Sequence, residues 1–434
     1  MKRKVLEQFI NWKNNPKRMP LVVNGARQVG KTYIIKEFGK LHFSNVVYVN
    51  LETNLAVNSY FETDITPLRI IQFLETATNT RIIAGETLIV LDEIQSCARA
   101  LTSLKTFCEE TPEFYIVAAG SLLGVAVNRE SFSFPVGKVD EISMFPMDFE
   151  EFLWATDKVK LGEDIRNHFD TNEAFPEILH TQALELYKQY LIVGGMPAVV
   201  REFIETKSLI TATEIQGRIL NEYIADMAKY ATATTSVKIR ACYNSIPAQL
   251  AKENKKFQYK TVQKGGTATI FGEAIEWLNF AGVVLKCQKI NHGFLPIAVY
   301  ADLSDFKLYM GDVGMLTMKS GMPHQLIMSD IEEDNGFLGV LSENYVAQAL
   351  ISNGFPLFYW KNDNTAELDF VFQIEGKVIP VEVKKGNRTK SISMNMFVEK
   401  YNCPYSIRIS KKNFGYENNI KSVPLYAVFC IAVN

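Results

Sequence analysis

Short apolar runs alternate with amphipathic stretches in the first third of the chain. The stretch at 33–38, which follows the first apolar run, has the spacing of a helix. Strands that alternate with helices are typical of a parallel, doubly wound α/β sheet, in which ligand sites lie at the carboxyl ends of the strands. We therefore predict one α/β domain over residues 1–150. Its expected strands are residues 21–24, 45–51, 88–91, 114–118 and 139–143.

Helical spacing dominates the middle of the chain. Residues 151–235 are predicted to form a helical, lid-like region, with a rigid turn between two helices at 193–197, where the chain reads Val-Gly-Gly-Met-Pro. Within residues 236–325, the segment 274–285 has the pattern of an amphipathic helix that turns at Gly282 into a strand. A winged helix-turn-helix ends in this order, and a small helical bundle has the same pattern, so both interpretations stay open.

The last predicted domain, residues 326–434, contains a β-hairpin. Its two strands are expected at 367–372 and 377–384, with a Glu-Gly turn at 375–376. Both strands are rich in Val, Ile and Phe, and a helix is expected to begin upstream at residue 341. The pattern therefore predicts a second mixed α/β domain at the end of the chain.

The segment between the first predicted strand and the helix after it reads GARQVGKT, which fits G-x-x-x-x-G-K-[ST] at every fixed position. Glycine at two of these positions lets the backbone curl, so that N–H groups and the helix N-terminus point at phosphate oxygens. Lys31 is expected to neutralise the β- and γ-phosphates, and the Thr32 hydroxyl to ligate Mg²⁺. The chain is therefore predicted to bind a nucleoside triphosphate. The loop consists of Gly25, Ala26, Arg27, Gln28, Val29, Gly30, Lys31 and Thr32.

A second part of the same site is expected where the strand at 88–91 ends in two carboxylates. Asp92 is placed to hold the Mg²⁺ shell, and Glu93 to orient and deprotonate the attacking water. Ser121 follows the strand at 114–118, whose tip would lie between these carboxylates and the γ-phosphate, so it is a candidate sensor of the nucleotide. A helix N-cap is the alternative role for Ser121, and both roles can hold at once.

The predicted C-terminal hairpin carries a third group of charged residues. Because side chains alternate along a strand, Glu382 and Lys384 share one face, and Asp369 at the start of the partner strand can converge on them. Two carboxylates bind Mg²⁺ or Mn²⁺, and a nearby ammonium can position or activate a water, so this arrangement suits phosphodiester cleavage. Glu343 on the upstream helix could add a further acidic group. A salt-bridged hairpin without a metal is the alternative.

Composition is that of a soluble enzyme. At 434 residues, with 47% apolar and 22% charged residues, the chain can bury two or three cores. No apolar run is long enough to span a membrane, and the basic, amphipathic start lacks the apolar core of a signal peptide, so we expect a cytoplasmic protein without a membrane partner. The six cysteines form no C-x-x-C pair and the five histidines do not cluster, which argues against a disulfide framework and a zinc site.

Charge is nearly balanced overall but not locally. The formal net charge of −2 provides no field that would attract nucleic acid to the whole molecule. Basic residues nevertheless exceed acidic ones ten to two over residues 1–40, five to one over 252–264 and eleven to seven over 361–434. Such clusters could contact phosphates, although a solvated lysine face is the more common explanation.

With these motifs identified, nearly the whole chain resembles a prokaryotic family of AAA+ ATPases that carry a C-terminal domain of uncharacterised function. The resemblance implies a P-loop ATPase core, a winged-helix-like middle and a C-terminal domain similar to the PD-(D/E)XK nuclease fold. The order of the motifs carries it more than any one of them. These motifs read GARQVGKT, LIVLDEI, AAGS, FPVGKV, MFPMDFEEFL, VGGMPAVV, LYMGDVGML and ELDFVF followed by IPVEVKKG.

The resemblance also implies roles for individual residues. One departure from the family pattern concerns the arginine finger, because many members read Gly-Arg where this chain has Gly137 and Lys138. Lysine is less suited to bidentate phosphate contact, which leaves Arg129 as the nearest candidate. The nucleotide-site pattern is matched by Lys31, Thr32, Asp92, Glu93 and Ser121, and the nuclease-like core by Glu343, Asp369, Glu382 and Lys384.

Two functions from different classes follow. In the first, binding and hydrolysis of ATP with Mg²⁺ drive a conformational change on DNA or on an assembly, and the terminal domain cleaves phosphodiesters. In the second, the protein is an ATP-dependent switch or interaction module whose nuclease-like domain is not catalytic. Self-association is a further expectation from the resemblance, because AAA+ domains usually complete their site from a neighbouring subunit. Small members of this kind can also work as monomers or dimers, so both states stay open.

Overall fold

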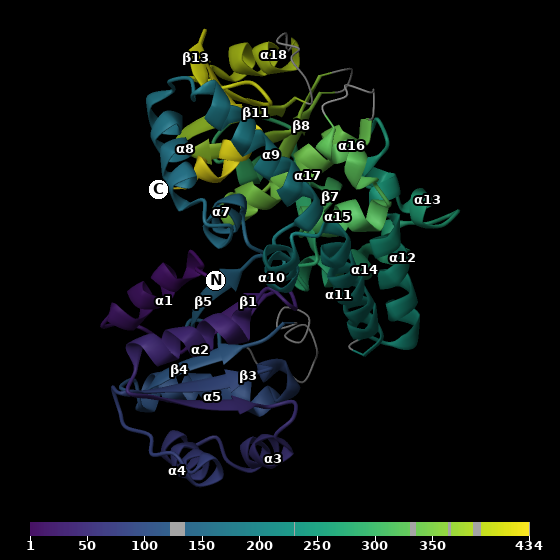
Figure 1. Ribbon diagram of the computed structural model, residues 1–434. Helices are drawn as coiled ribbons and strands as arrows, with labels where there is room; N and C mark the ends of the chain where they lie inside the picture. Colours follow the sequence, from purple (N-terminus) through teal and green to yellow (C-terminus); the bar gives the residue numbers. More distant parts are fainter. Residues whose placement is uncertain (122–134, 230, 330–335, 363–365, 385–391, 434) are drawn as a thin grey trace. The chain divides into compact units, whose positions relative to one another are not determined.

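The computed structural model describes residues 1–121, 135–229, 231–329, 336–362, 366–384 and 392–433. The chain forms two compact units (Figure 1). The first comprises residues 2–145 with 280–282, and the second comprises residue 1 with 146–279 and 283–434. Among the described residues, no helix combines the length and the apolar character needed to cross a membrane.

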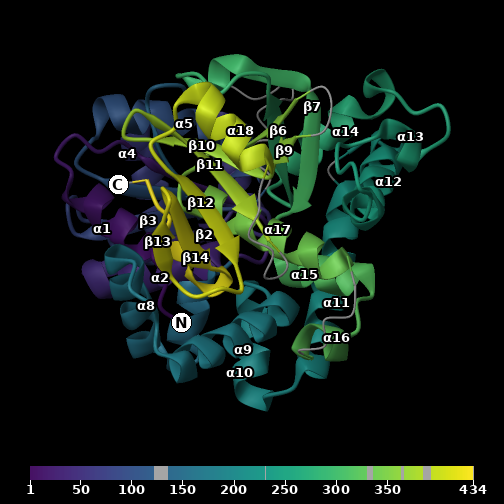
Figure 2. The same ribbon diagram turned by 90° about the horizontal axis from the view of Figure 1, so that it is seen from above.

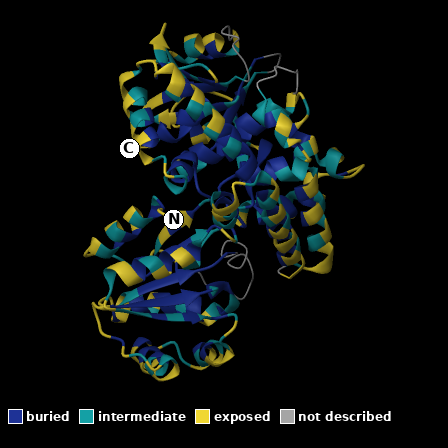
Figure 3. Ribbon diagram, viewed as in Figure 1, coloured by how far each residue is buried: buried dark blue, intermediate teal, exposed yellow. Residues whose placement is uncertain are grey.

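A five-stranded parallel sheet forms the centre of the first unit, in the order β2-β3-β4-β1-β5. The buried residues of its strands are almost entirely apolar, and Figure 3 shows the buried stretches in dark blue. The predicted α/β sheet is therefore confirmed, with strand ends that differ from the predicted ones by at most one residue. The strands are β1 (Leu21–Gly25), β2 (Asn45–Asn50), β3 (Thr87–Asp92), β4 (Tyr115–Ala119) and β5 (Asp140–Met144).

Helices cover both faces of this sheet (Figure 1). On one face, α3, α4 and α5 bury apolar side chains such as Phe61, Leu74 and Phe107 against the strands. On the other face, Phe9 of α1 lies against Phe38 of α2, with ring centroids 5.2 Å apart. The helices are α1 (Val5–Asn14), α2 (Lys31–His42), α3 (Leu55–Thr63), α4 (Pro67–Thr78) and α5 (Ala98–Glu110), with a 3-10 turn η1 (Ile94–Ser96).

The second unit begins with a run of helices. The first of them, α7, is stabilised at its start by a capping box, in which Asp148 and Glu151 each accept the other's backbone N–H. The predicted turn at 193–197 is confirmed, since α9 ends at Val193 and α10 begins at Pro197. The helices are α7 (Phe149–Ala155), α8 (Val159–Thr171), α9 (Glu177–Val193), α10 (Pro197–Thr206), α11 (Leu209–Lys229), α12 (Ala233–Leu250), α13 (Tyr259–Val262) and α14 (Ala268–Phe280).

Two sheets follow, in the orders β7-β6-β8-β9 and β10-β11-β12-β14-β13. Helix α17 lies beside β7 and β11, and α18 packs on β9 and β11 (Figure 2). The strands are β6 (Val284–Ile290), β7 (Ala301–Met310), β8 (Phe358–Lys361), β9 (Glu367–Leu368), β10 (Phe370–Ile374), β11 (Lys377–Val383), β12 (Ser406–Ser410), β13 (Gly415–Glu417) and β14 (Ile420–Pro424). The helical segments are η2 (Ile297–Tyr300), α15 (Val313–Ser320), α16 (His324–Met328), α17 (Gly336–Ser352), α18 (Ile392–Tyr401) and η3 (Leu425–Cys430).

The predicted helix-to-strand turn at Gly282 is present, because α14 leads into β6 and Gly282 has φ +69°. Strands β6 and β7 pair antiparallel, so the order from α12 onward is three helices and then a strand pair. Strand β6 also pairs with β8 in parallel. The sheet therefore takes strands from both sides of residue 325, where a domain boundary was predicted.

The predicted C-terminal hairpin is present as β10 and β11, with Glu375 and Gly376 in its turn at positive φ. Its first strand differs from the prediction. The predicted strand is interrupted at Asp369, so that β9 pairs with β8 in one sheet and β10 pairs with β11 in the other. The upstream helix also starts earlier than predicted, at Gly336 instead of residue 341. Only the pairing partners, which lie far apart in the sequence, determine where such a strand divides.

Candidate nucleotide site and C-terminal acidic cluster

The predicted phosphate loop joins β1 to α2. Gly30 has φ +91° and is the N-cap of α2. Gly25 has φ +147°, and a Cβ atom there would overlap the carbonyl oxygen of Met144 on the neighbouring β5. Glycine is therefore required at position 25 for two reasons, its backbone conformation and the close approach of β5.

Lys31 lies at the start of α2 with its side chain folded back over the loop. Its Nζ donates to the carbonyl oxygens of Gly25 and Ala26, at 2.8 Å each. Burial lowers the pKa of Lys31 to about 8, although the nearby charges of Glu93 and Asp92 oppose that shift. The ammonium is thus held in the loop that it is predicted to serve.

The two predicted metal ligands meet directly. Thr32 Oγ1 donates to Asp92 Oδ2 at 2.8 Å, which joins the start of α2 to the carboxyl end of β3. A hydroxyl and a carboxylate are oxygen ligands of the kind that Mg²⁺ prefers, so this pair fits the metal predicted here.

Tyr48 is a third member of this group that the sequence pattern did not indicate. Its hydroxyl donates to Asp92 Oδ2 at 2.8 Å from the adjacent strand β2. Burial and the hydrogen bond to Asp92 raise the pKa of Tyr48, so the phenol stays a donor. One tyrosine among the apolar residues 46–49 does not by itself indicate such a role.

Glu93 follows β3 with φ +53°. Its backbone N–H donates to Asp92 Oδ1 at 3.0 Å, and its side-chain Oε2 accepts from Gln95 Nε2 at 2.5 Å. Left-handed backbone is uncommon outside glycine and clusters at functional sites. Gln95, two residues further on, therefore orients the Glu93 carboxylate. The negative charge of Glu93 also raises the pKa of Lys31, against the larger effect of burial.

The third predicted element, Ser121, is buried and lies two residues after the end of β4. Strand β4 lies between β3 and β1, so its tip lies between the strands that carry the carboxylates and the phosphate loop. Its sensor role stays a prediction. Arg129 lies outside the described residues, and Lys138 is paired with Glu109 at 3.0 Å.

Arg3 supports the loop from the N-terminal segment. Its guanidinium donates to the carbonyl oxygen of Val29 at 2.8 Å and to that of Phe145 at 2.7 Å. The side chain is buried, which is rare for arginine unless it is paired. In the sequence, Arg3 is one of ten basic residues in the first forty, and nothing distinguishes it from the others.

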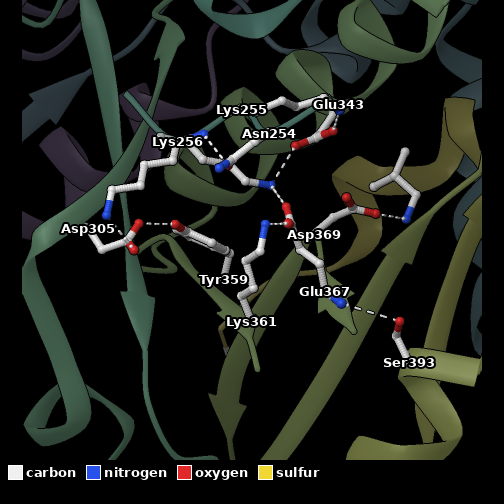
Figure 4. A network of polar contacts seen from close by, with 12 residues as sticks. Asn254, Lys255, Lys256, Asp305, Glu343, Tyr359, Lys361, Glu367, Asp369 and Ser393 are labelled. Atoms are coloured by element: carbon white, nitrogen blue, oxygen red, sulfur yellow. Dashed lines mark hydrogen bonds and ion pairs between the residues drawn. The ribbon is translucent and has the colours of Figure 1, made fainter. Parts of the chain in front are cut away.

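Glu343 is the centre of the C-terminal cluster (Figure 4). It is buried on α17, and Lys307 Nζ at 3.2 Å and the Tyr309 hydroxyl at 2.5 Å both donate to its Oε1. Lys255 forms an ion pair with its Oε2. Burial alone would raise the pKa of Glu343, but the Lys307 and Lys255 charges lower it to about 2. Glu343 is therefore a carboxylate with both oxygens occupied.

Lys307 connects Glu343 to a second carboxylate. It is buried on β7, and its Nζ lies 2.8 Å from Glu367 Oε1. Glu367 in turn pairs with Lys361 at 2.9 Å. Burying an ammonium is costly unless it is paired, and Lys307 meets this requirement with two carboxylates.

Of the predicted D…E-x-K residues, Asp369 lies beside this cluster and contacts β11, the strand that carries Glu382. Asp369 Oδ2 accepts the Val383 N–H of β11 at 2.8 Å. Glu382 Oε1 pairs with Lys384 Nζ at 2.6 Å, so the shared face predicted for these two residues is confirmed. Burial and the charge of Glu343 raise the pKa of Asp369 well above its usual range. This shift indicates that Asp369 and Glu343 are close enough to repel.

The cluster fits a metal less well than the Thr32 and Asp92 pair does. Over the described ranges, no group of three or more His, Cys, Asp or Glu side chains is arranged to hold a metal ion. Glu343 would have to exchange Lys255 or Lys307 for the metal. Glu382 Oε2, however, is buried without a hydrogen-bond partner in the part of the chain that is described. One oxygen of the Glu382 carboxylate is thus left without a hydrogen bond among these residues.

Four members of the cluster escaped the sequence prediction. One signal was available, because Lys307 is a charged residue in the otherwise apolar end of β7. Lys255 comes from a loop, and Tyr309 and Glu367 come from strand ends, where polar and charged residues are normal. The four are Lys255, Lys307, Tyr309 and Glu367.

Three parts of the chain match known families. Residues 17–153 match the family described as AAA domain. Residues 184–326 match a Domain of unknown function (DUF8612), and residues 338–428 match a Domain of unknown function (DUF4143). Neither of the latter descriptions names a nuclease, so the nuclease-like interpretation of 326–434 stays a prediction.

Curated relatives include the uncharacterized proteins Rv2008c of Mycobacterium tuberculosis and Mb2031c of Mycobacterium bovis. Each is 33% identical to this chain over 93 residues, which is 21% of this chain and 20% of the relative. The chain thus matches about a fifth of the length of these relatives.

Solved structures similar to this chain include the Walker-type ATPase PabY2304 of Pyrococcus abyssi, at 13% identity, 73% coverage of this chain, 95% of that chain and a TM-score of 0.45. The ORC2 protein of Aeropyrum pernix follows at 12% identity, 80% and 93% coverage and a TM-score of 0.35. These scores are too low to carry an argument. The loop, the Thr32 and Asp92 pair and Ser121 all fall within residues 17–153, the part of the chain that matches the AAA domain family.

Proposed function

We propose that this protein binds ATP with Mg²⁺ and hydrolyses it. The hydrogen bond between Thr32 and Asp92 carries the proposal, because it brings the phosphate-loop hydroxyl and the β3 carboxylate to the place where one Mg²⁺ would contact both. Mg²⁺ would supply charge neutralisation at the transferred phosphoryl group. The family match of residues 17–153 supports the same conclusion.

The chain's own residues divide the work. Lys31 contacts the β- and γ-phosphates, for which it exchanges its hydrogen bonds to the Gly25 and Ala26 carbonyl oxygens. Glu93 orients the attacking water and accepts its proton. Ser121, at the tip of β4, contacts the γ-phosphate. An arginine, either Arg129 or one from a second copy of the chain, completes the charge stabilisation.

Two substitutions separate binding from turnover. Lys31→Ala removes a charged contact to the phosphates and should weaken ATP binding roughly 10- to 100-fold. Glu93→Gln leaves the Mg²⁺ and phosphate contacts in place, so ATP should bind as in the parent while turnover falls roughly 100-fold or more. Calorimetric titration and phosphate release measure the two quantities. Turnover of Glu93→Gln within a few-fold of the parent would exclude the role assigned to Glu93.

We further propose that ATP turnover is coupled to DNA. The order of α12, α13 and α14 followed by the antiparallel pair β6 and β7 supports a winged-helix-like segment. Duplex, single-stranded or branched DNA should therefore raise the rate of ATP hydrolysis by the full chain. If none of these changes turnover or binds the protein at low salt, the DNA role is wrong.

The C-terminal domain has two candidate roles. Metal-dependent phosphodiester cleavage is supported by the Asp369, Glu382 and Lys384 set and by the Glu382 Oε2 atom, which has no hydrogen-bond partner among the described residues. A non-catalytic role in an ATP-dependent switch is supported by the two lysines that occupy Glu343. Incubation of the parent protein with linear, nicked and branched DNA in Mg²⁺ or Mn²⁺, with and without ATP, separates the two. Absence of cleavage under all these conditions would leave the switch.

A further inference from the structure

The Asp92 carboxylate of the candidate nucleotide site is held by more than the phosphate loop. Its Oδ2 accepts two hydroxyl donors at 2.8 Å each, Thr32 from α2 and Tyr48 from β2. Its Oδ1 accepts the backbone N–H of Glu93 at 3.0 Å. A carboxylate offers about four acceptor positions, so these three bonds fix the orientation of the group and leave room for one more partner.

The two hydroxyls at Oδ2 differ in what they do when a metal binds. Thr32 is itself a predicted Mg²⁺ ligand, and a hydroxyl that coordinates a cation turns a lone pair toward it. The hydrogen bond from Thr32 to Asp92 must then adjust. Tyr48 belongs to a different strand and lies outside the phosphate loop. Of the two donors, Tyr48 is therefore the one that can stay in place.

The register of the sheet explains how Tyr48 reaches Asp92. Strands β2 and β3 pair in parallel, with Asn50 opposite Asp92. Side chains alternate along a strand, so Tyr48, two residues before Asn50, lies on the same face of the sheet as Asp92. Two residues of a strand span about 7 Å, which a tyrosine side chain can bridge and a serine or threonine cannot.

The ring of Tyr48 is in turn fixed by α2. Lys36 Nζ lies 3.6 Å from the centroid of the ring, within the range of a cation–π contact. Lys36 lies one turn after Thr32, so both side chains project from the same face of α2. One face of this helix therefore contacts both members of the hydrogen-bonded pair, with Thr32 on the Asp92 carboxylate and Lys36 on the Tyr48 ring.

We propose that Tyr48 is a positioning residue of the nucleotide site, whose hydroxyl keeps the Asp92 carboxylate oriented when Mg²⁺ takes up the Thr32 hydroxyl. The inference rests on the proposed binding of ATP with Mg²⁺ and adds the residue that holds its β3 carboxylate. In this role Tyr48 contacts neither phosphate nor metal. Removal of such an orienting partner typically weakens metal affinity roughly 10- to 100-fold. The hydroxyl should therefore matter for Mg²⁺ and not for the nucleotide alone.

Tyr48→Phe tests the inference, because it removes the hydroxyl and keeps the ring that Lys36 contacts. On the full chain, the Mg²⁺ concentration that gives half-maximal ATP turnover should rise roughly 10-fold, and higher Mg²⁺ should restore most of the turnover. Calorimetric titration with ATP should show parent-like affinity in EDTA and weakened affinity at the Mg²⁺ midpoint of the parent. Electron paramagnetic resonance of Mn²⁺ in the presence of ATP measures the metal without turnover.

Tyr115→Phe is the matched control. Tyr115 lies on β4 of the same sheet, the Arg18 guanidinium carbon lies 3.7 Å from its ring centroid, and its hydroxyl donates to the Lys13 carbonyl oxygen at 3.4 Å. The substitution thus removes a comparable hydroxyl with a cation over the ring, but one that does not bind Asp92. Its Mg²⁺ dependence should match that of the parent.

A double-mutant cycle tests whether Tyr48 acts through Asp92. In an Asp92→Asn background, Tyr48→Phe should change Mn²⁺ binding much less than it does in the parent, because the group that the hydroxyl orients is already altered. Tyr48→Met also removes the hydroxyl while keeping a long apolar side chain, and it should show the same loss of Mg²⁺ affinity. This second variant covers the case in which Tyr48→Phe does not fold.

Three results would overturn the inference, and they differ in what else they exclude. If ATP turnover by the parent depends on Mg²⁺ and Tyr48→Phe has the same Mg²⁺ midpoint, the hydroxyl is merely structural and the proposed ATPase stands. Equal losses of ATP affinity in EDTA and in Mg²⁺ would show that the hydroxyl supports the nucleotide and not the metal. If the parent binds no ATP under either condition, the proposed function is wrong and the inference fails with it.

Discussion

Lys31 illustrates how burial sets the behaviour of a single charged residue. Its ammonium is almost fully removed from water, and the resulting desolvation lowers the pKa to about 8. Asp92 and Glu93 provide negative charge that partly opposes this shift. A lysine in water would stay charged far above pH 9. In this site, the same residue loses its proton only slightly above physiological pH.

This pKa predicts a pH dependence of nucleotide binding. The ammonium form of Lys31 is the one expected to contact phosphate. The titration of Lys31 should therefore leave the affinity for ATP constant below about pH 8 and lower it above that pH, because binding then requires uptake of a proton. The decrease should approach roughly ten-fold per pH unit. Calorimetric titrations between pH 7 and 10 measure it.

Lys31→Arg is the control for this prediction. Arginine stays charged over the whole pH range, so the affinity of the Lys31→Arg protein for ATP should not fall above pH 8. That affinity should be lower than in the parent at every pH, because the planar guanidinium fits the loop less well. A parent and a Lys31→Arg protein with the same pH profile would show that another group is responsible.

Among the elements, the turn between α9 and α10 has the most demanding geometry. Met147 donates its N–H to the Gly195 carbonyl oxygen at 2.7 Å, and Gly195 donates its own to Asp312 Oδ2 at 2.6 Å. The Met147 carbonyl oxygen accepts from Tyr190 at 2.5 Å. Burial raises the pKa of Asp312 to about 6. Three segments that are distant in sequence therefore share one buried set of hydrogen bonds.

Gly195→Ala should destabilise this unit strongly. A Cβ atom at position 195 would overlap the Met147 carbonyl oxygen, and the backbone around it is held by the hydrogen bonds to Met147 and Asp312. We expect a loss of about 2 kcal/mol or more in the free energy of unfolding. Urea denaturation followed by circular dichroism measures the change.

The same substitution at Gly272 is the matched control. Gly272 lies within α14, and a Cβ there would meet no atom within 4 Å. Alanine is the better helix former, so Gly272→Ala should leave stability unchanged or raise it by up to about 1 kcal/mol. Equal effects at the two positions would contradict the role given to the turn.

For the molecule as a whole, the candidate nucleotide site and the acidic cluster lie in different compact units. The phosphate loop, Asp92 and Glu93 belong to the unit of residues 2–145, and the acidic cluster belongs to the unit of residues 146–279 and 283–434. Each site is built from side chains of its own unit. A substitution that abolishes the proposed cleavage of nucleic acid therefore need not lower the basal rate of ATP turnover.

Asp369→Ala and Lys384→Ala should each abolish metal-dependent cleavage of nucleic acid and leave basal ATP turnover near the parent level. Asp369→Ala removes a ligand, and Lys384→Ala removes the ammonium that faces Glu382. Lys377→Ala, on the same strand but exposed, is the control and should affect neither activity. A nuclease assay and phosphate release on the same preparations measure both. Cleavage that persists in both variants would exclude this cluster as its source.

Local sequence was sufficient wherever the chemistry is held by consecutive residues. The phosphate loop uses backbone groups of one eight-residue segment between a strand and a helix, and strand order in a parallel sheet then places Asp92 and Ser121 beside it. Alternation along β11 likewise placed Glu382 and Lys384 on one face. These features have a period or a spacing, so the pattern alone could predict them.

Contacts between distant segments were decided only by the tertiary structure. No spacing relates Arg3 to Val29, Tyr48 to Asp92 or Lys255 to Glu343, because each pair depends on which segments the fold brings together. The interruption of the predicted strand at Asp369 has the same origin, because its first part pairs with β8 and its second part pairs with β11. The sequence by itself determined which chemical groups are available and which local elements carry them, whereas long-range packing decided which charges are buried and paired, because desolvation and ion pairing depend on neighbours in space and not on neighbours in the chain.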